Sequence, residues 1–141
     1  MVVSANKILA THTINGRSVR MTGENNVLEN NILVSTSRNA RLVELSGSHC
    51  MIGRNVMEVL MAPEECRSGC GICAAGENCR ENIISENLIK NVLDCGIFAD
   101  ASVGMVANNQ VFPATGGAAR AGRENVAMLT KLDERNIQSI I

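Results

Sequence analysis

The chain has 141 residues, of which 13 are basic and 14 are acidic, so its formal net charge is −1. This length is typical of one domain, and the balanced charge argues against a nucleic-acid or anionic-membrane partner. No apolar run is long enough for a membrane-spanning helix, and no N-terminal signal peptide is visible. We therefore expect a protein of the cytoplasm or of a phage particle.

Aromatic side chains are almost missing, since the chain has two Phe and neither Trp nor Tyr. The core must then consist of small and branched side chains. The chain also has six Cys. Without a visible secretion signal, we interpret them as buried thiols rather than as a disulfide framework.

A short repeat runs through residues 1–112, the first of two predicted regions. Two adjacent apolar residues, two variable residues and an Asn recur at 27–31, 51–55, 83–87 and 105–109, ending at Asn31, Asn55, Asn87 and Asn109. A degenerate fifth copy ends at Asn136. A second element, "RLVEL" at 41–45, "CGICA" at 70–74 and "CGIFA" at 95–99, precedes the copies, with "SVRM" at 18–21 as its first counterpart.

These elements are too short for helices and are separated by Gly and Asn, as short strands are. Three short strands in each repeat predict an all-β fold, a right-handed parallel β-helix of about four to five coils. Stacked coils lie about 4.8 Å apart, so equivalent residues should form ladders. Asn tolerates a left-handed bend, and its amide can bond to the Asn above and below.

The stretch "CGIFADASVGMVANNQVF" resembles a coil of the right-handed parallel β-helix proteins. That superfamily includes pectate lyases, polysaccharide epimerases, periplasmic copper-maturation proteins and phage tailspikes. The resemblance covers residues 16–112 and implies the fold. It implies no particular activity, because this fold carries many unrelated ones.

Two segments depart from the repeat. The coil between Asn55 and Asn87 is longer than its neighbours, and the excess lies at 60–69, where an inserted loop could carry function. A tolerated surface insertion is the alternative. Residues 113–141 begin with a Gly/Ala-rich linker and continue with a segment that suits either an amphipathic helix or a fifth coil. We expect this second region to cap the stack or to mediate oligomerisation.

The stretch "CRSGCGIC" at 66–73 raises the question of a metal site, because four thiolates could bind zinc: Cys66, Cys70, Cys73 and Cys79. However, Cys70 and Cys95 both precede Gly-Ile, so we assign these two to a structural ladder. Cys66 and Cys79 have no counterparts and remain candidate metal or redox thiols. We expect no cofactor, with zinc as the alternative.

Catalysis by a β-helix enzyme would require clustered carboxylates. The candidates are Asp94 and Asp100, which flank one coil, together with Glu64 and Glu65 in the inserted loop. Solvated surface carboxylates are the simpler interpretation. We therefore expect a non-catalytic binding or structural module, homo-oligomeric and of phage or mobile-element type, with a carbohydrate or protein ligand. A carbohydrate-active lyase, hydrolase or epimerase, with its site near the inserted loop, is the alternative.

Overall fold

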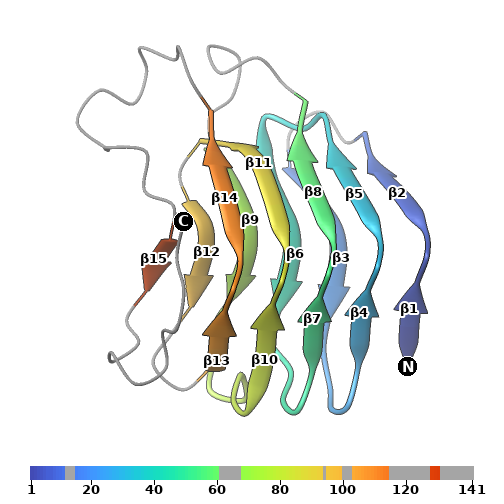
Figure 1. Ribbon diagram of the computed structural model, residues 1–141, viewed down its shortest axis with the longest axis vertical. Coiled ribbons are helices and arrows are strands. Elements are labelled where there is room, and N and C mark those ends of the chain that lie inside the picture. The colour runs from blue at the N-terminus through green and yellow to red at the C-terminus, as the bar shows by residue number, and fades with distance from the viewer. Residues whose placement is uncertain (12–14, 61–67, 94, 100–102, 115–127, 131–141) are drawn as a thin grey trace.

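A computed structural model describes residues 1–11, 15–60, 68–93, 95–99, 103–114 and 128–130. In these residues the chain is all-β, and its strands form three parallel sheets of five strands each (Figure 1). Each strand pairs with the strand three places further along the chain, so one turn of three strands stacks on the next. The predicted parallel β-helix, a solenoid of about four turns, is confirmed.

The three sheets are named A, B and C in the order in which the chain visits them. Sheet A contains β1 (Val2–Ser4), β4 (Val27–Glu29), β7 (Met51–Gly53), β10 (Asn82–Ser85) and β13 (Gly104–Ala107). Sheet B contains β2 (Lys7–Ala10), β5 (Ile32–Ser35), β8 (Val56–Val59), β11 (Leu88–Val92) and β14 (Gln110–Pro113). Sheet C contains β3 (Asn15–Met21), β6 (Asn39–Leu45), β9 (Ser68–Ala74), β12 (Cys95–Ala99) and β15 (Met128–Thr130).

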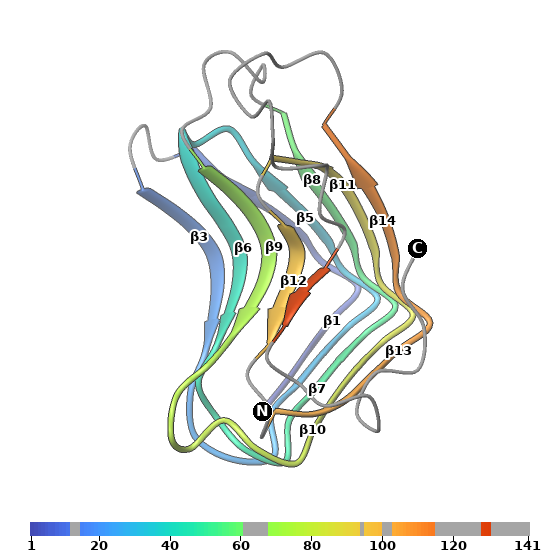
Figure 2. The same cartoon turned by 90° about the vertical axis from the view of Figure 1, so that its left-hand side faces the viewer.

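The core is a narrow column enclosed by the three sheets (Figure 2). Alternate strand residues point inward and stack on the same position of the next coil, as Leu28 does on Ile52. Leu33 and Met57 form an equivalent buried column in sheet B. Such stacking fills the column with aliphatic side chains, which explains how the fold is built almost without aromatic residues.

Sheets A and B meet at a sharp bend (Figure 2). The predicted ladder of Asn side chains lies at this bend, between each strand of sheet A and the strand of sheet B that follows it. The Nδ2 of Asn31, Asn55 and Asn87 donates to Oδ1 of the next ladder Asn at 2.9–3.1 Å. The same Oδ1 atoms accept from the backbone N–H of the preceding ladder Asn at 3.0–3.1 Å. Asn6, which the repeat analysis missed, adds a further rung by bonding to Asn31.

The structure corrects one detail of this bend. The left-handed residue is not the ladder Asn but the residue before it, and these are Ala5, Asn30, Arg54, Glu86 and Asn108, with φ of 53–58°. Placing the turn there leaves four of the Asn side chains, Asn31, Asn55, Asn87 and Asn109, pointing inward, where they are buried and can bond along the stack. The position before the ladder is exposed and varies in residue type.

Both segments that depart from the repeat lie largely outside the described residues. Of the predicted insertion 60–69, Leu60 is exposed, and Ser68 and Gly69 already belong to β9. In the predicted second region, Pro113 ends β14 and residues 128–130 form β15, which extends sheet C by pairing with β12. The interpretation of 113–141 as a cap or assembly segment therefore stays a prediction. No helix in the described part of the chain is long and apolar enough to cross a membrane.

Candidate functional site

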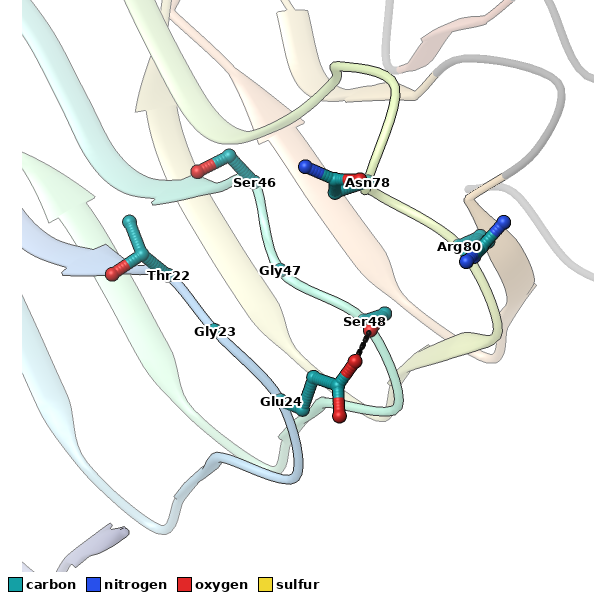
Figure 3. Close-up of a pocket in the computed structure, with 8 residues that line it drawn as sticks. All are labelled: Thr22, Gly23, Glu24, Ser46, Gly47, Ser48, Asn78 and Arg80. Carbon is teal, nitrogen blue, oxygen red and sulfur yellow. Dashed lines mark hydrogen bonds between the residues drawn. The ribbon is translucent and has the colours of Figure 1, made fainter.

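A polar groove with a volume of about 450 Å³ lies across the turns that join sheet C to sheet A (Figure 3). Three consecutive turns contribute, those between β3 and β4, β6 and β7, and β9 and β10. The lining residues are Thr22, Gly23, Glu24, Ser46, Gly47, Ser48, Asn78 and Arg80. The groove therefore runs along the stacking direction, so one ligand could contact several coils.

Backbone hydrogen bonds between coils fix the shape of the groove. Ser48 N–H donates to the Gly23 carbonyl at 3.0 Å, and Asn25 N–H donates to the Ser48 carbonyl at 3.1 Å. This close approach requires Gly47, because a Cβ there would lie 2.1 Å from the Gly23 oxygen. Backbone atoms thus form the floor of the groove, and side chains of the same turns line it.

The third turn is longer, and it forms one wall. Cys79 N–H donates to the Gly76 carbonyl at 3.0 Å and closes a tight turn that presents Asn78. Below it, Cys79 is fully buried, and its Sγ donates to the Leu45 carbonyl at 3.5 Å. Asn82 anchors the floor by donating from Nδ2 to the Gly47 carbonyl at 3.0 Å. The side chains that hold the wall and the floor are therefore buried, whereas those facing the groove can contact a ligand.

The groove carries hydrogen-bonding groups of both kinds. Thr22, Ser46 and Ser48 offer hydroxyls, which donate and accept, and the Asn78 amide does both as well. Among the described lining residues, two are charged and their charges are opposite, a carboxylate at Glu24 and a guanidinium at Arg80. Figure 3 shows Glu24 turned toward Ser48, whose Oγ donates to Oε1 at 3.5 Å. Such a lining, polar but with no net charge, suits a neutral, hydroxyl-rich ligand better than a strongly charged one.

All four predicted catalytic residues lie outside the described residues, as does one of the two predicted metal thiols. They are Asp94, Asp100, Glu64, Glu65 and Cys66. The other thiol, Cys79, is an anchor of the groove wall and is shielded from solvent. Among the residues that the structure describes, no three metal-ligating side chains come together. The hypotheses of a carboxylate site and of a zinc site stay predictions.

The two cysteines assigned to a ladder lie side by side in sheet C, away from the groove. Cys70 pairs in register with Cys95, and their Sγ atoms are 3.1 Å apart. Both residues lie on the outward column that continues from Arg17 and Arg41. The contact with Cys95 and burial raise the pKa of the Cys70 thiol well above its usual range.

The sequence analysis missed the groove, although a signal was present. A small residue followed by Gly begins each of the three turns, at Thr22-Gly23, Ser46-Gly47 and Ala75-Gly76. The predicted repeat is defined by its Asn turn, and these residues fall between its defining positions. Comparison with family models, curated proteins and solved structures finds no match for this chain.

Proposed function

We propose that the protein is a non-catalytic binding module that holds a neutral oligosaccharide in the groove across the three turns. The supporting observation is the set of hydroxyl, amide, carboxylate and guanidinium groups fixed on a main-chain floor. Sugars present many hydroxyls that both donate and accept, so a lining with both functions can satisfy them.

A binding role is favoured over glycoside hydrolysis by the composition of this groove. Most glycosidases flank the scissile bond with two carboxylates. Among the described residues that line the groove, Glu24 is the one carboxylate. Its partner Ser48 could hold it in place for a hydrogen bond to a sugar hydroxyl.

The test is calorimetric titration of the purified protein with neutral and acidic oligosaccharides, after a glycan-array screen. We expect binding to neutral sugars that weakens at least about tenfold in Arg80→Ala and in Glu24→Gln, since a hydrogen bond to a charged group contributes about 1.5–3 kcal/mol. Arg38→Ala is the matched control, because Arg38 is another exposed arginine, in the turn before β6, and does not line the groove. Its affinity should equal that of the wild type.

Three results would overturn this function. They are the absence of binding to any sugar, equal affinity in the two groove variants and the wild type, and the release of new reducing or unsaturated ends from the bound sugar. The last result would favour the carbohydrate-active enzyme.

An assembly role is the second candidate, and the outer face of sheet B supports it. Leu9, Ile32 and Phe112 occupy outward positions there and are 54%, 46% and 53% exposed. Leu9 and Ile32 lie on the adjacent strands β2 and β5, whereas Phe112 lies at the opposite edge of the sheet, beyond Glu58 and Lys90. An apolar pair beside the edge of a sheet is typical of an interaction surface. We propose a second copy of the chain as the partner. Light scattering across a concentration series should show an oligomer that Ile32→Glu weakens, and a monomer at every concentration would contradict it.

A further inference from the structure

The paired thiols of Cys70 and Cys95 have no part in the groove, yet their geometry is specific. They occupy register positions on neighbouring parallel strands, β9 and β12, and their Sγ atoms are 3.1 Å apart. Each is followed by a glycine, and a Cβ on Gly71 would lie 2.5 Å from the Gly96 oxygen. Because the residues after both cysteines are glycines, no side chain there holds the two strands apart.

The two thiols differ in exposure in a way that orders a reaction. Cys70 is partly exposed on the outer face of sheet C, whereas Cys95 is 5% exposed. A dissolved oxidant would therefore reach Cys70 first. Cys95 would then be in position to attack the modified sulfur from the adjacent strand.

We propose that Cys70 and Cys95 form a reversible redox pair that a low-molecular-weight disulfide oxidises to a cross-link between the third and fourth coils. The Cys70 thiolate attacks one sulfur of the oxidant, forming a mixed disulfide and releasing one thiolate. The Cys95 thiolate then attacks the Cys70 sulfur, which forms the Cys70–Cys95 bond and expels the second thiolate. The protein loses two electrons and two protons, and the oxidant becomes two thiols.

The strand geometry makes this cross-link easy to reverse. The Cα atoms of paired parallel strands are about 4.8 Å apart, whereas those of a relaxed disulfide are usually about 5.5–6 Å apart. Closing the bond therefore strains the local geometry. Strained disulfides are more readily reduced than relaxed ones, so the pair is suited to switching rather than to permanent stapling.

The test uses the full chain, fully reduced and then incubated anaerobically with excess oxidised glutathione in alkaline buffer, because the raised pKa of Cys70 leaves little thiolate at neutral pH. Remaining thiols are blocked with N-ethylmaleimide, and the protein is digested with trypsin. Cys70 then lies in peptide 68–80 and Cys95 in peptide 91–120. We expect a cross-linked pair of these peptides that lacks two hydrogen atoms and disappears after dithiothreitol. Because Cys73 and Cys79 share the first peptide, fragmentation must place the bond on Cys70.

Matched variants check the assignment. Cys70→Ser should abolish the cross-link. Cys73→Ser should retain it, because Cys73 lies on the same strand but pairs with Phe98 rather than with Cys95. The wild-type experiment does not depend on the folding of any variant. Maleimide-labelled Cys95 beside glutathionylated or labelled Cys70 would overturn the proposal. A cross-link that fragmentation places on Cys73 or Cys79 would overturn it as well.

Discussion

Asn55 and Asn87 are joined by two hydrogen bonds that cross from one coil to the next. Oδ1 of Asn87 accepts from the backbone N–H of Asn55 at 3.1 Å and from its Nδ2 at 3.0 Å. Asn87 in turn donates to Oδ1 of Asn109 at 2.9 Å and to the Ile52 carbonyl at 3.0 Å. One side chain thus satisfies buried polar groups on both neighbouring coils.

Replacing Asn87 by Ala should destabilise the fold strongly. The change leaves the buried N–H of Asn55 without its acceptor, and the Ile52 carbonyl loses the amide donor. Since each unsatisfied buried polar group costs about 1–3 kcal/mol, we expect a loss of about 3 kcal/mol in the free energy of unfolding. Urea unfolding followed by circular dichroism measures it.

The control for this substitution is Asn6→Ala at the first rung. Asn6 is exposed and bonds to one ladder neighbour, Asn31, so water can replace what the side chain provided. We expect a loss of about 1 kcal/mol or less. Equal losses in the two variants would show that the buried rungs do not carry the stability assigned to them.

The close approach of two turns predicts a second effect. A Cβ at residue 47 would lie 2.1 Å from the Gly23 oxygen, so Gly47→Ala must push the first and second turns apart. We expect a loss of about 2 kcal/mol, in the range of overpacking, together with weaker sugar binding. At Gly53 an added Cβ would make ordinary contacts at 3.6 Å, so Gly53→Ala should change stability little. Thermal unfolding measures the stability of the two variants, and calorimetric titration measures their sugar binding. A Gly47→Ala variant with normal stability and normal binding would contradict the close packing proposed for the groove floor.

The sequence predicted the solenoid because stacking imposes a constraint that can be read without coordinates. A position such as Asn55 or Ile52 stacks on the equivalent position of the next coil. Its residue must therefore fit both its own strand or turn and the residues above and below it. The groove was not predicted, because only part of its lining, the pairs Thr22-Gly23 and Ser46-Gly47, recurs from coil to coil. Ser46 and Asn78 belong to different coils and different turn lengths, and only the stacking of those turns brings them together.

Asn6 and the left-handed residues show two further limits. Asn6 follows two apolar residues and two variable ones, as the other rungs do, but Ala5 and Lys7 beside it disguise the copy. The prediction placed the left-handed conformation one position too late in the chain. Both Asn30 and Asn31 could adopt that conformation, and only the inward side chain of Asn31 decides between them. Residue type alone carries no such information.

Glu44 lies among three arginines on the outer face of sheet C, which predicts a salt-dependent stability. It contacts Arg17, Arg20 at 3.6 Å and Arg41 at 3.7 Å. Glu44→Gln leaves Arg17 and Arg41 facing each other across paired strands. We expect a loss of about 1 kcal/mol in low salt, shrinking as salt screens the like charges.

Glu58→Gln provides the comparison for that measurement. Within the described part of the chain, Glu58 pairs with one cation, Lys90, at 3.8 Å, and an ion pair of this kind contributes about 0–1 kcal/mol. Denaturant titrations with urea in low and high NaCl give the values. A Glu44→Gln loss that does not change with salt would mean that shape rather than charge holds the cluster.

The raised pKa of Cys70 predicts that the fold weakens in alkaline solution. Contact with Cys95, burial and the charges of Cys95 and Cys73 all favour the neutral thiol, and Arg41 is the facing residue on β6. The unfolded chain loses this proton near the ordinary value of 9.0, while the folded chain keeps it. The contribution of Cys70 is therefore complete below that pH and is lost as the pH rises through the folded-state pKa.

Urea unfolding under a reducing agent, from about neutral pH to well above the ordinary thiol pKa of about 8.5–9, measures this decline. Cys70→Ser removes the titrating group but keeps a side chain of similar size, so its stability should fall less steeply over the alkaline range. The difference between the two curves isolates the thiol from the lysines and arginines, which titrate in both proteins. Parallel curves would contradict the raised pKa and would show that the Cys70 thiol titrates alike in the folded and unfolded chain.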